Sequence, residues 1–211
     1  MLKAFFRTQI RKFEAQWGYN AAYMHDLLDA GPGTFFRFSF VPGLGHSKDA
    51  PAAAMAAVGI VGTLAEDCGP CTQISVDVAA ANGVKPETLC AILAGDRVAM
   101  GETAALGYDF ARAVLDRHLG DADETRDEIV RRWGQKAVVA LSLALTTARM
   151  YPTLKYGLGH GKACSRVTVA GEPAPFHRPE LLAGRSRPTS AGGSIRLSKN
   201  HGSLISNSAA V

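Results

Sequence analysis

The sequence predicts an all-α fold, and three observations support this class. Apolar residues recur at helical spacing up to about residue 170, alanine-rich segments dominate the middle of the chain, and no pair of neighbouring strands is evident. Prolines and glycines fall between the apolar segments, where helices begin and end. We therefore expect a helical bundle.

The chain has 211 residues, of which 47% are hydrophobic, and it can bury one sizeable core. We expect a helical domain over residues 1–170, divided into N-terminal helices with an aromatic loop (1–50) and a core (51–170). Pro, Gly, Ser and Arg dominate residues 171–211, which we expect to form a disordered tail. The net charge of +4 is modest and not interleaved with aromatic residues, so we expect no nucleic-acid partner.

Cysteine usage and apolar run lengths indicate the compartment. Four cysteines, two of them isolated at Cys90 and Cys164, do not resemble the disulfide framework of a secreted protein. The first six residues are too short for a signal-peptide core. The apolar stretches 50–64 and 137–148 are shorter than the ~20 residues needed to span a bilayer. We expect a cytoplasmic protein in which both stretches are buried helices.

The first helix is amphipathic, with apolar residues at positions 2, 5, 6, 10, 13 and 17 and basic residues between them. A membrane-surface helix is one interpretation, but packing against the core or a subunit interface is favoured, so we expect no membrane partner.

Residues 19–28 form a second helix. Residues 34–41 form either a short strand or a loop or short helix that inserts phenylalanines into the core, and 42–48 form a loop. His46, in that loop, is a less favoured candidate for reaching the active site.

Proline, glycine and capping residues predict where the core helices begin and end. We expect helices over 51–66, from Pro70 to about residue 82, and from Pro86 to about residue 95. Asp96 is placed to cap a long helix that ends near residue 120, with Val98 and Val114 inward.

The last helices of the domain follow from two further signals. Thr125 with Glu128 forms a capping box for a short helix. Residues 135–150 form a central helix that is broken at Tyr151-Pro152, with one more helical turn over 153–160.

The candidate site is the segment Cys68-Gly69-Pro70-Cys71 at the start of a predicted helix. At a helix start, the free backbone N–H groups and the positive end of the helix dipole stabilise a thiolate relative to a thiol. They can lower a cysteine pKa from ~8.5 to roughly 3.5–7.5. Such a pair is suited to thiol–disulfide exchange. Glu66 and Asp67 precede it, and they either stabilise the helix start or transfer protons.

Residues 65–71, continued by 79–84 and 89–96, resemble the core of the alkylhydroperoxidase AhpD-like and carboxymuconolactone decarboxylase family. The resemblance extends over about residues 51–169. It implies an all-helical homo-oligomer, which reduces peroxides with electrons from a thiol or lipoyl-type donor. We expect no bound cofactor or metal. It also implies that Cys71 attacks the peroxide and that Cys68 resolves the sulfenic acid as a disulfide. Helix position alone would instead give Cys68 the lower pKa.

Two positions depart from this family. Its usual histidine four residues after the second cysteine is Ser75, and its usual glutamate twelve residues before the first cysteine is Ala56. Glu66 or Asp67 could replace the acid, and His46 or His160 could approach from elsewhere. Catalytic efficiency therefore depends on residues outside the motif.

Other functions are compatible with parts of this sequence. A thioredoxin shares the Cys-Gly-Pro-Cys motif, but it needs strands that the flanking helical segments do not supply. A zinc site usually takes two close cysteine pairs, whereas Cys90 and Cys164 are isolated. Lactone decarboxylation does not rely on a CxxC pair. The main alternative is a non-catalytic oligomeric scaffold or redox sensor that lacks the relay histidine.

Overall fold

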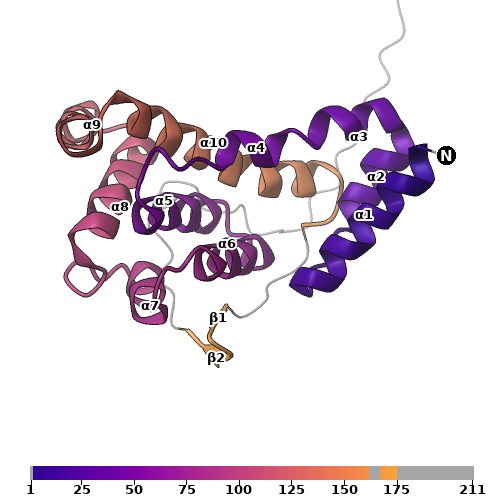
Figure 1. Cartoon of the computed structure of the whole chain (residues 1–211), viewed down its shortest axis with the longest axis horizontal. Coiled ribbons are helices and arrows are strands. Elements are labelled where there is room, and N and C mark those ends of the chain that lie inside the picture. Colours follow the sequence, from indigo (N-terminus) through magenta and orange to yellow (C-terminus); the bar gives the residue numbers. More distant parts are fainter. Residues whose placement is uncertain (1, 162–166, 175–211) are drawn as a thin grey trace, which may run out of the picture.

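The computed structural model describes residues 2–161 and 167–174. Within these residues the chain is mostly helical, with one small antiparallel ladder (Figure 1), which confirms the predicted all-α class. The elements are α1 (Leu2–Trp17), α2 (Ala22–Ala30), α3 (Pro32–Phe38), α4 (Val41–Gly45), α5 (Ala52–Ala65), α6 (Gly69–Ala81), α7 (Pro86–Ala94), α8 (Gly101–Asp116), α9 (Leu119–Trp133), α10 (Gln135–Gly157), β1 (Thr168–Val169) and β2 (Glu172–Pro173).

Helix α5 is the centre of the fold and packs against α6, α7, α8 and α10. It is apolar on nearly every face and rich in alanine, so neighbouring helices approach it from several sides. Where α8 crosses it, a Cβ atom built on Gly107 would lie 2.7 Å from the backbone oxygen of Ala54. Only glycine permits this close crossing.

An aromatic cluster holds the N-terminal helices to the rest of the bundle. Its buried members include Phe6, Tyr23, Phe35 and Phe38, and Tyr151 of α10 packs against it. This resolves the alternatives for residues 34–41 in favour of a short helix. The predicted loop over 42–48 is wrong in part, because residues 41–45 form α4.

Helix α8 begins later than predicted. The carboxylate of Asp96 accepts hydrogen bonds from the amides of Val98 and Ala99 (3.1 and 3.0 Å), so it caps a turn before the helix. The helix itself starts at Gly101, and the residues that it buries are Ala104, Gly107, Phe110, Ala111 and Ala113. Val98 is 93% exposed and Val114 is 41% exposed, which corrects their predicted inward positions.

The predicted capping box at Thr125 is wrong because α9 already begins at Leu119. Thr125 lies inside the helix, and its hydroxyl donates to the carbonyl oxygen of Asp121 at 2.8 Å. Serine and threonine commonly make this bond when they occur within a helix.

The predicted break at Pro152 is also wrong, because α10 continues through it to Gly157. A proline inside a helix costs ~3 kcal/mol, and burial of the following turn offsets this cost. Leu154 in that turn packs on the aromatic cluster. By length and composition α10 could cross a membrane, contrary to the estimate from sequence. It packs here against α4, α5 and α9, as expected for the central helix of a bundle.

Side-chain hydrogen bonds from α6 fix the small ladder. The carboxamide of Gln73 donates to the carbonyl oxygen of Thr168 (3.0 Å) and accepts from its amide (2.7 Å). Val167 and Val169 are buried in the core beside α6 and α7. The second described range ends at residue 174, which is four residues past the expected domain end at 170. The rest of the expected tail and Cys164 lie outside the described residues.

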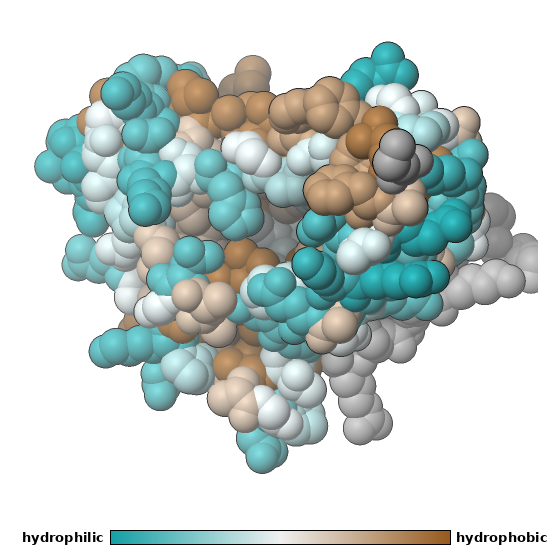
Figure 2. All heavy atoms as spheres, turned by 45° about the vertical axis from the view of Figure 1, so that its right-hand side comes forward, coloured by the Kyte–Doolittle hydropathy of each residue, from teal (hydrophilic) through white to brown (hydrophobic). Residues whose placement is uncertain are grey.

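Exposed apolar side chains gather over the N-terminal helices. In Figure 2 they form a band along the upper edge of the molecule, over α3 and α4. Phe36, Phe40 and Leu44 are each at least half exposed, and Leu2 and Phe5 of α1 are similarly exposed. Patches of this kind commonly mark interaction surfaces.

Candidate functional site

The two cysteines lie at the corner between α5 and α6. Helix α5 ends at Ala65, the chain reverses through Glu66 and Asp67, and α6 begins at Gly69 with Pro70 in its first turn. Asp67 adopts a left-handed conformation with φ 53°, which asparagine and aspartate tolerate better than most residues. The predicted helical hairpin and the position of Pro70 are confirmed.

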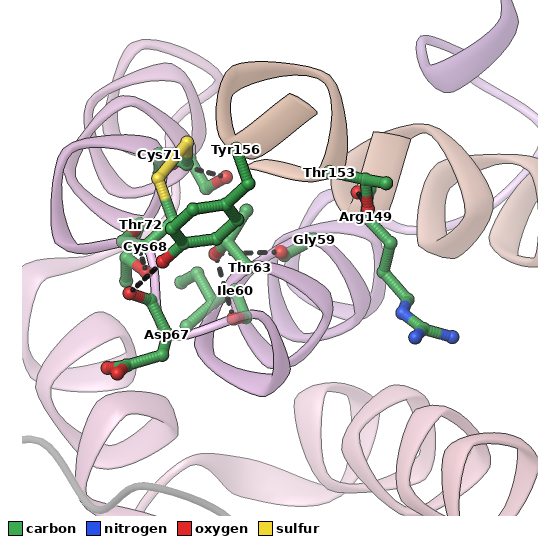
Figure 3. Close-up of a disulfide and its surroundings, with 11 residues drawn as sticks. Gly59, Ile60, Thr63, Asp67, Cys68, Cys71, Thr72, Arg149, Thr153 and Tyr156 are labelled. Carbon is green, nitrogen blue, oxygen red and sulfur yellow. Dashed lines mark hydrogen bonds between the residues drawn. A yellow bond between two sulfur atoms is a disulfide. The ribbon is translucent and has the colours of Figure 1, made fainter. Parts of the chain in front are cut away.

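Cys68 and Cys71 are joined by a disulfide, with Cα atoms 5.2 Å apart (Figure 3). Cys68 precedes the first residue of α6 and Cys71 lies in its first turn. Their exposed fractions are only 6% and 4%. Such a pair is compatible with redox chemistry, provided that a reactant can reach one of the sulfurs.

A cavity of about 490 Å³ provides that access, and Cys71 lines it. Residues of α1, α2 and α4 form part of its walls, and small residues on α5, α6 and α10 leave the space open. Those residues are Ala52, Ala56 and Gly59 of α5, Ser75 and Ala79 of α6, and Ala144 and Ala148 of α10. The volume falls within the ~300–1,000 Å³ typical of small-molecule sites.

The cavity runs from exposed residues at the surface to buried residues that include Cys71. His46 and Lys48, which follow α4, are exposed and line it, whereas Ala56 and Thr63 on its inner wall are buried. Cys68 does not line the cavity within the described part of the chain. The two cysteines therefore differ in access, and Cys71 is the one that a bound molecule would meet.

Both positions that depart from the family pattern line this cavity. Ala56 leaves part of it empty, and the hydroxyl of Ser75 donates to the carbonyl oxygen of Cys71 at 3.1 Å. Neither can transfer a proton to or from a bound molecule as histidine or glutamate would. His46 lines the same cavity and brings an imidazole from a different segment. Its Nδ1 lies 3.2 Å from the carbonyl oxygen of Pro42.

The two acidic candidates have other contacts. Glu66 forms an ion pair with Arg149 of α10, in which Nε lies 2.6 Å from Oε1. The carbonyl oxygen of Asp67 accepts a hydrogen bond from the phenol of Tyr156 at 3.0 Å (Figure 3). Neither residue lines the cavity in the described structure, so their predicted catalytic roles stay predictions. Nε2 of His160 lies 2.6 Å from Asp26, and His160 does not line the cavity either.

The wall next to the aromatic cluster is apolar enough to perturb ionisable groups. Burial raises the pKa of Tyr19 to about 12 and that of Tyr151 to about 12, and both line the cavity. Burial also lowers the pKa of Lys155, whose ammonium lies 5.0 Å from the ring centre of Tyr19. The phenols of Tyr19 and Tyr151 are therefore neutral hydrogen-bonding groups at physiological pH.

Sequence patterns identified the cysteines but not the other walls of the cavity. Tyr19, Thr147 and Tyr151 come from segments distant in sequence and carry no motif. The one available signal was the small-residue face of α5, because alanine and glycine at helical spacing permit either close packing or open space. Among the described residues, no group of three His, Cys, Asp or Glu side chains is arranged to hold a metal ion.

Fold and site together define an all-helical protein with a buried CxxC disulfide beside an apolar cavity. Comparison with known proteins found no match among family models, curated proteins or solved structures. The family resemblance therefore stays a prediction from the motif.

Proposed function

We propose that this protein is a thiol–disulfide oxidoreductase of alkylhydroperoxidase type, which reduces peroxides through Cys71 and Cys68. The observation that carries the proposal is the position of Cys71, which is bonded to Cys68 and lines a small-molecule cavity. A disulfide buried without a cavity would have no route to a substrate. The helix start supports the thiolate form of Cys71 once the disulfide is reduced.

The reaction begins from the dithiol form. The Cys71 thiolate attacks one oxygen of the hydroperoxide, the O–O bond breaks, and the departing alkoxide takes a proton to give the alcohol. The resulting Cys71 sulfenic acid is attacked by Cys68, which forms the disulfide and releases water. An external thiol or lipoyl-type dithiol then reduces the disulfide and is itself oxidised.

His46 is our candidate for the proton relay that Ser75 and Ala56 cannot supply. It is the one histidine among the described residues that line the cavity, and imidazole exchanges protons near neutral pH. Because His46 is exposed at the rim and Cys71 is buried, the thiol proton of Cys71 would reach a neutral His46 through water in the cavity and return to the alkoxide by the same route. The relay would then come from the α4–α5 connection instead of from α6.

A homo-oligomer in the reducing cytoplasm is part of the same proposal. The exposed residues of α1, α3 and α4 support an interface, because Phe36 packs against both Phe6 and Phe40 and continues the buried aromatic cluster to the surface. A reducing compartment would keep supplying the dithiol form that the reaction consumes.

The test is peroxide consumption with a dithiol reductant. Wild type should turn over, Cys71→Ser should not react, and Cys68→Ser should accumulate a sulfenic acid at Cys71 that dimedone traps. Cys90→Ser serves as the matched control, because Cys90 is a partly buried free thiol outside the pair. Equal slow rates in all four proteins would reject the proposal.

Burial of both sulfurs favours the alternative, a redox sensor or scaffold. In that case reduction of the disulfide would change stability or oligomeric state without turnover. Unfolding and sedimentation of oxidised and reduced protein, measured beside the peroxide assay, separate the two functions.

A further inference from the structure

The distribution of charge around the cavity indicates what it binds. Among the described residues that line it, Lys48 is the one with a permanent charge, and none is acidic. Lys48 is exposed at the rim and forms no ion pair with any described residue. The neighbouring carboxylate of Asp49 accepts a hydrogen bond from the Ser47 hydroxyl at 2.6 Å. The described lining therefore carries one permanent positive charge, at Lys48, and the Asp49 carboxylate next to it in the chain does not line the cavity.

The hydroxyl donors of α5, α6 and α10 on the inner walls are already used in hydrogen bonds. The hydroxyls of Thr63 and Thr147 donate to carbonyl oxygens of their own helices at 3.0 and 2.9 Å. The hydroxyl of Ser75 does the same. Because these donors are satisfied, a bound molecule meets mainly alanine, glycine and aromatic surface between the rim and Cys71, and the phenols of Tyr19, Tyr23 and Tyr151 are polar groups of the aromatic wall. Each methylene that leaves water for such a surface adds to binding, which makes an aliphatic chain a suitable occupant.

We propose that the cavity binds a medium-chain carboxylate, with its carboxylate at Lys48 and its chain directed toward Cys71. The substrates would then be hydroperoxides of medium-chain carboxylic acids, in which the O–O group lies on the chain near Cys71. This substrate assignment rests on the proposed peroxidase function. The binding assignment does not, because it can be tested on the oxidised protein.

The experiment is calorimetric titration of the oxidised full chain with decanoate below its micelle concentration. Decanol, decyltrimethylammonium and acetate are the comparison ligands, since they remove the charge, reverse it or remove the chain. We expect decanoate to bind most tightly and acetate not to bind. Added salt should weaken decanoate binding and leave decanol binding unchanged.

Two variants locate the ligand. Lys48→Met should weaken decanoate binding about fivefold and leave decanol unaffected, as expected for an exposed ion pair. Lys136→Met, at an exposed lysine of α10, is the matched control and should change nothing. Equal affinity of wild type for decanoate and decanol, or an unchanged Lys48→Met, would overturn the assignment of the carboxylate to Lys48.

Gly59→Leu tests the cavity itself. A Cβ atom at Gly59 would meet no atom within 4 Å, so leucine can project into the cavity without strain in the surrounding structure. We expect binding of both decanoate and decanol to fall more than tenfold. Gly120→Leu is the control, because its position on α9 is equally open. Undiminished decanoate binding by Gly59→Leu would overturn the proposal.

The outcomes separate the two proposals. Decanoate binding without peroxide turnover would reject the oxidoreductase function and keep the carboxylate site. Turnover of small peroxides without decanoate binding would reject the carboxylate site and keep the oxidoreductase function.

Discussion

The phenol of Tyr156 donates a hydrogen bond of 3.0 Å to the carbonyl oxygen of Asp67, the residue directly before Cys68 (Figure 3). This bond ties the end of α10 to the corner that carries the disulfide. Glu66 and Arg149 make a second link between the same two elements. The corner that carries the disulfide is therefore fixed to α10 by two side-chain contacts.

Removal of this bond should weaken the corner. Tyr156→Phe keeps the ring and loses the donor, and we expect a loss of ~0.5–1.5 kcal/mol in the free energy of unfolding, measured by urea denaturation. Thr153→Ala, one turn earlier, is the control, because the Thr153 hydroxyl donates to the carbonyl oxygen of Arg149 in its own helix. Equal stability of Tyr156→Phe and wild type would show that the bond contributes nothing.

Asp67 should be sensitive to backbone conformation. Its φ of 53° disfavours β-branched residues, so Asp67→Val should lose ~1–2 kcal/mol more in urea unfolding than Asp67→Gly, because glycine adopts this conformation without strain. The same two variants test the predicted catalytic role. If the carboxylate transfers protons, both variants lose peroxide turnover. If only the backbone matters, Asp67→Gly retains it.

The fold was largely predictable where proline and glycine delimit apolar segments. Pro51, Pro70 and Pro86 mark the starts of α5, α6 and α7 to within two residues, because proline fits the first turn of a helix. The errors arose where side-chain bonds or packing competed with these signals. Asp96 caps a turn ahead of α8, and the aromatic cluster carries α10 past Pro152.

The site was predictable only in part. The CxxC motif is local, so Cys68, Cys71 and the helix start could be identified from sequence. The cavity is built from several segments that meet only in the folded chain, and no local pattern places His46, Thr147 and Tyr151 beside Cys71. Such convergence depends on helix packing over long sequence separations.

His46 should affect chemistry if it is the relay. We expect His46→Gln to lower kcat/KM for peroxide by about 10²-fold or more at neutral pH and to remove an ionisation from the pH–rate profile. His160→Gln is the control, because His160 is paired with Asp26 away from the cavity. An unchanged pH profile in His46→Gln would exclude this relay.

Lys155 should destabilise the fold at neutral pH. Its side chain is 5% exposed, and burial lowers the pKa of its ammonium. A lysine whose folded pKa is lowered loses its proton more easily when folded, so stability is reduced at low pH and recovers as pH rises toward the unfolded value of ~10.5. Lys155→Met should therefore be more stable than wild type at pH 7, with the difference shrinking toward pH 9.5. A less stable variant at pH 7 would show that the contact with the Tyr19 ring outweighs the burial cost.

The crossing of α5 and α8 should tolerate nothing larger than glycine. A Cβ atom at position 107 would lie 2.7 Å from the oxygen and 2.9 Å from the Cα of Ala54, and both atoms belong to the backbone of the central helix. Because no side chain can move aside, the helices must separate, and overpacking of this kind costs ~1–3 kcal/mol. Gly107→Ala should lose this amount in urea unfolding despite the better helix propensity of alanine.

The control for this crossing is Gly120→Ala. No atom lies within 4 Å of a Cβ at position 120, so only the gain in helix propensity remains, and stability should stay level or rise by up to ~1 kcal/mol. Since α5 also forms a wall of the cavity, the displacement in Gly107→Ala should reach the site. We expect it to weaken decanoate binding where Gly120→Ala does not. If the two variants were equally stable, α5 and α8 would not pack as closely as described.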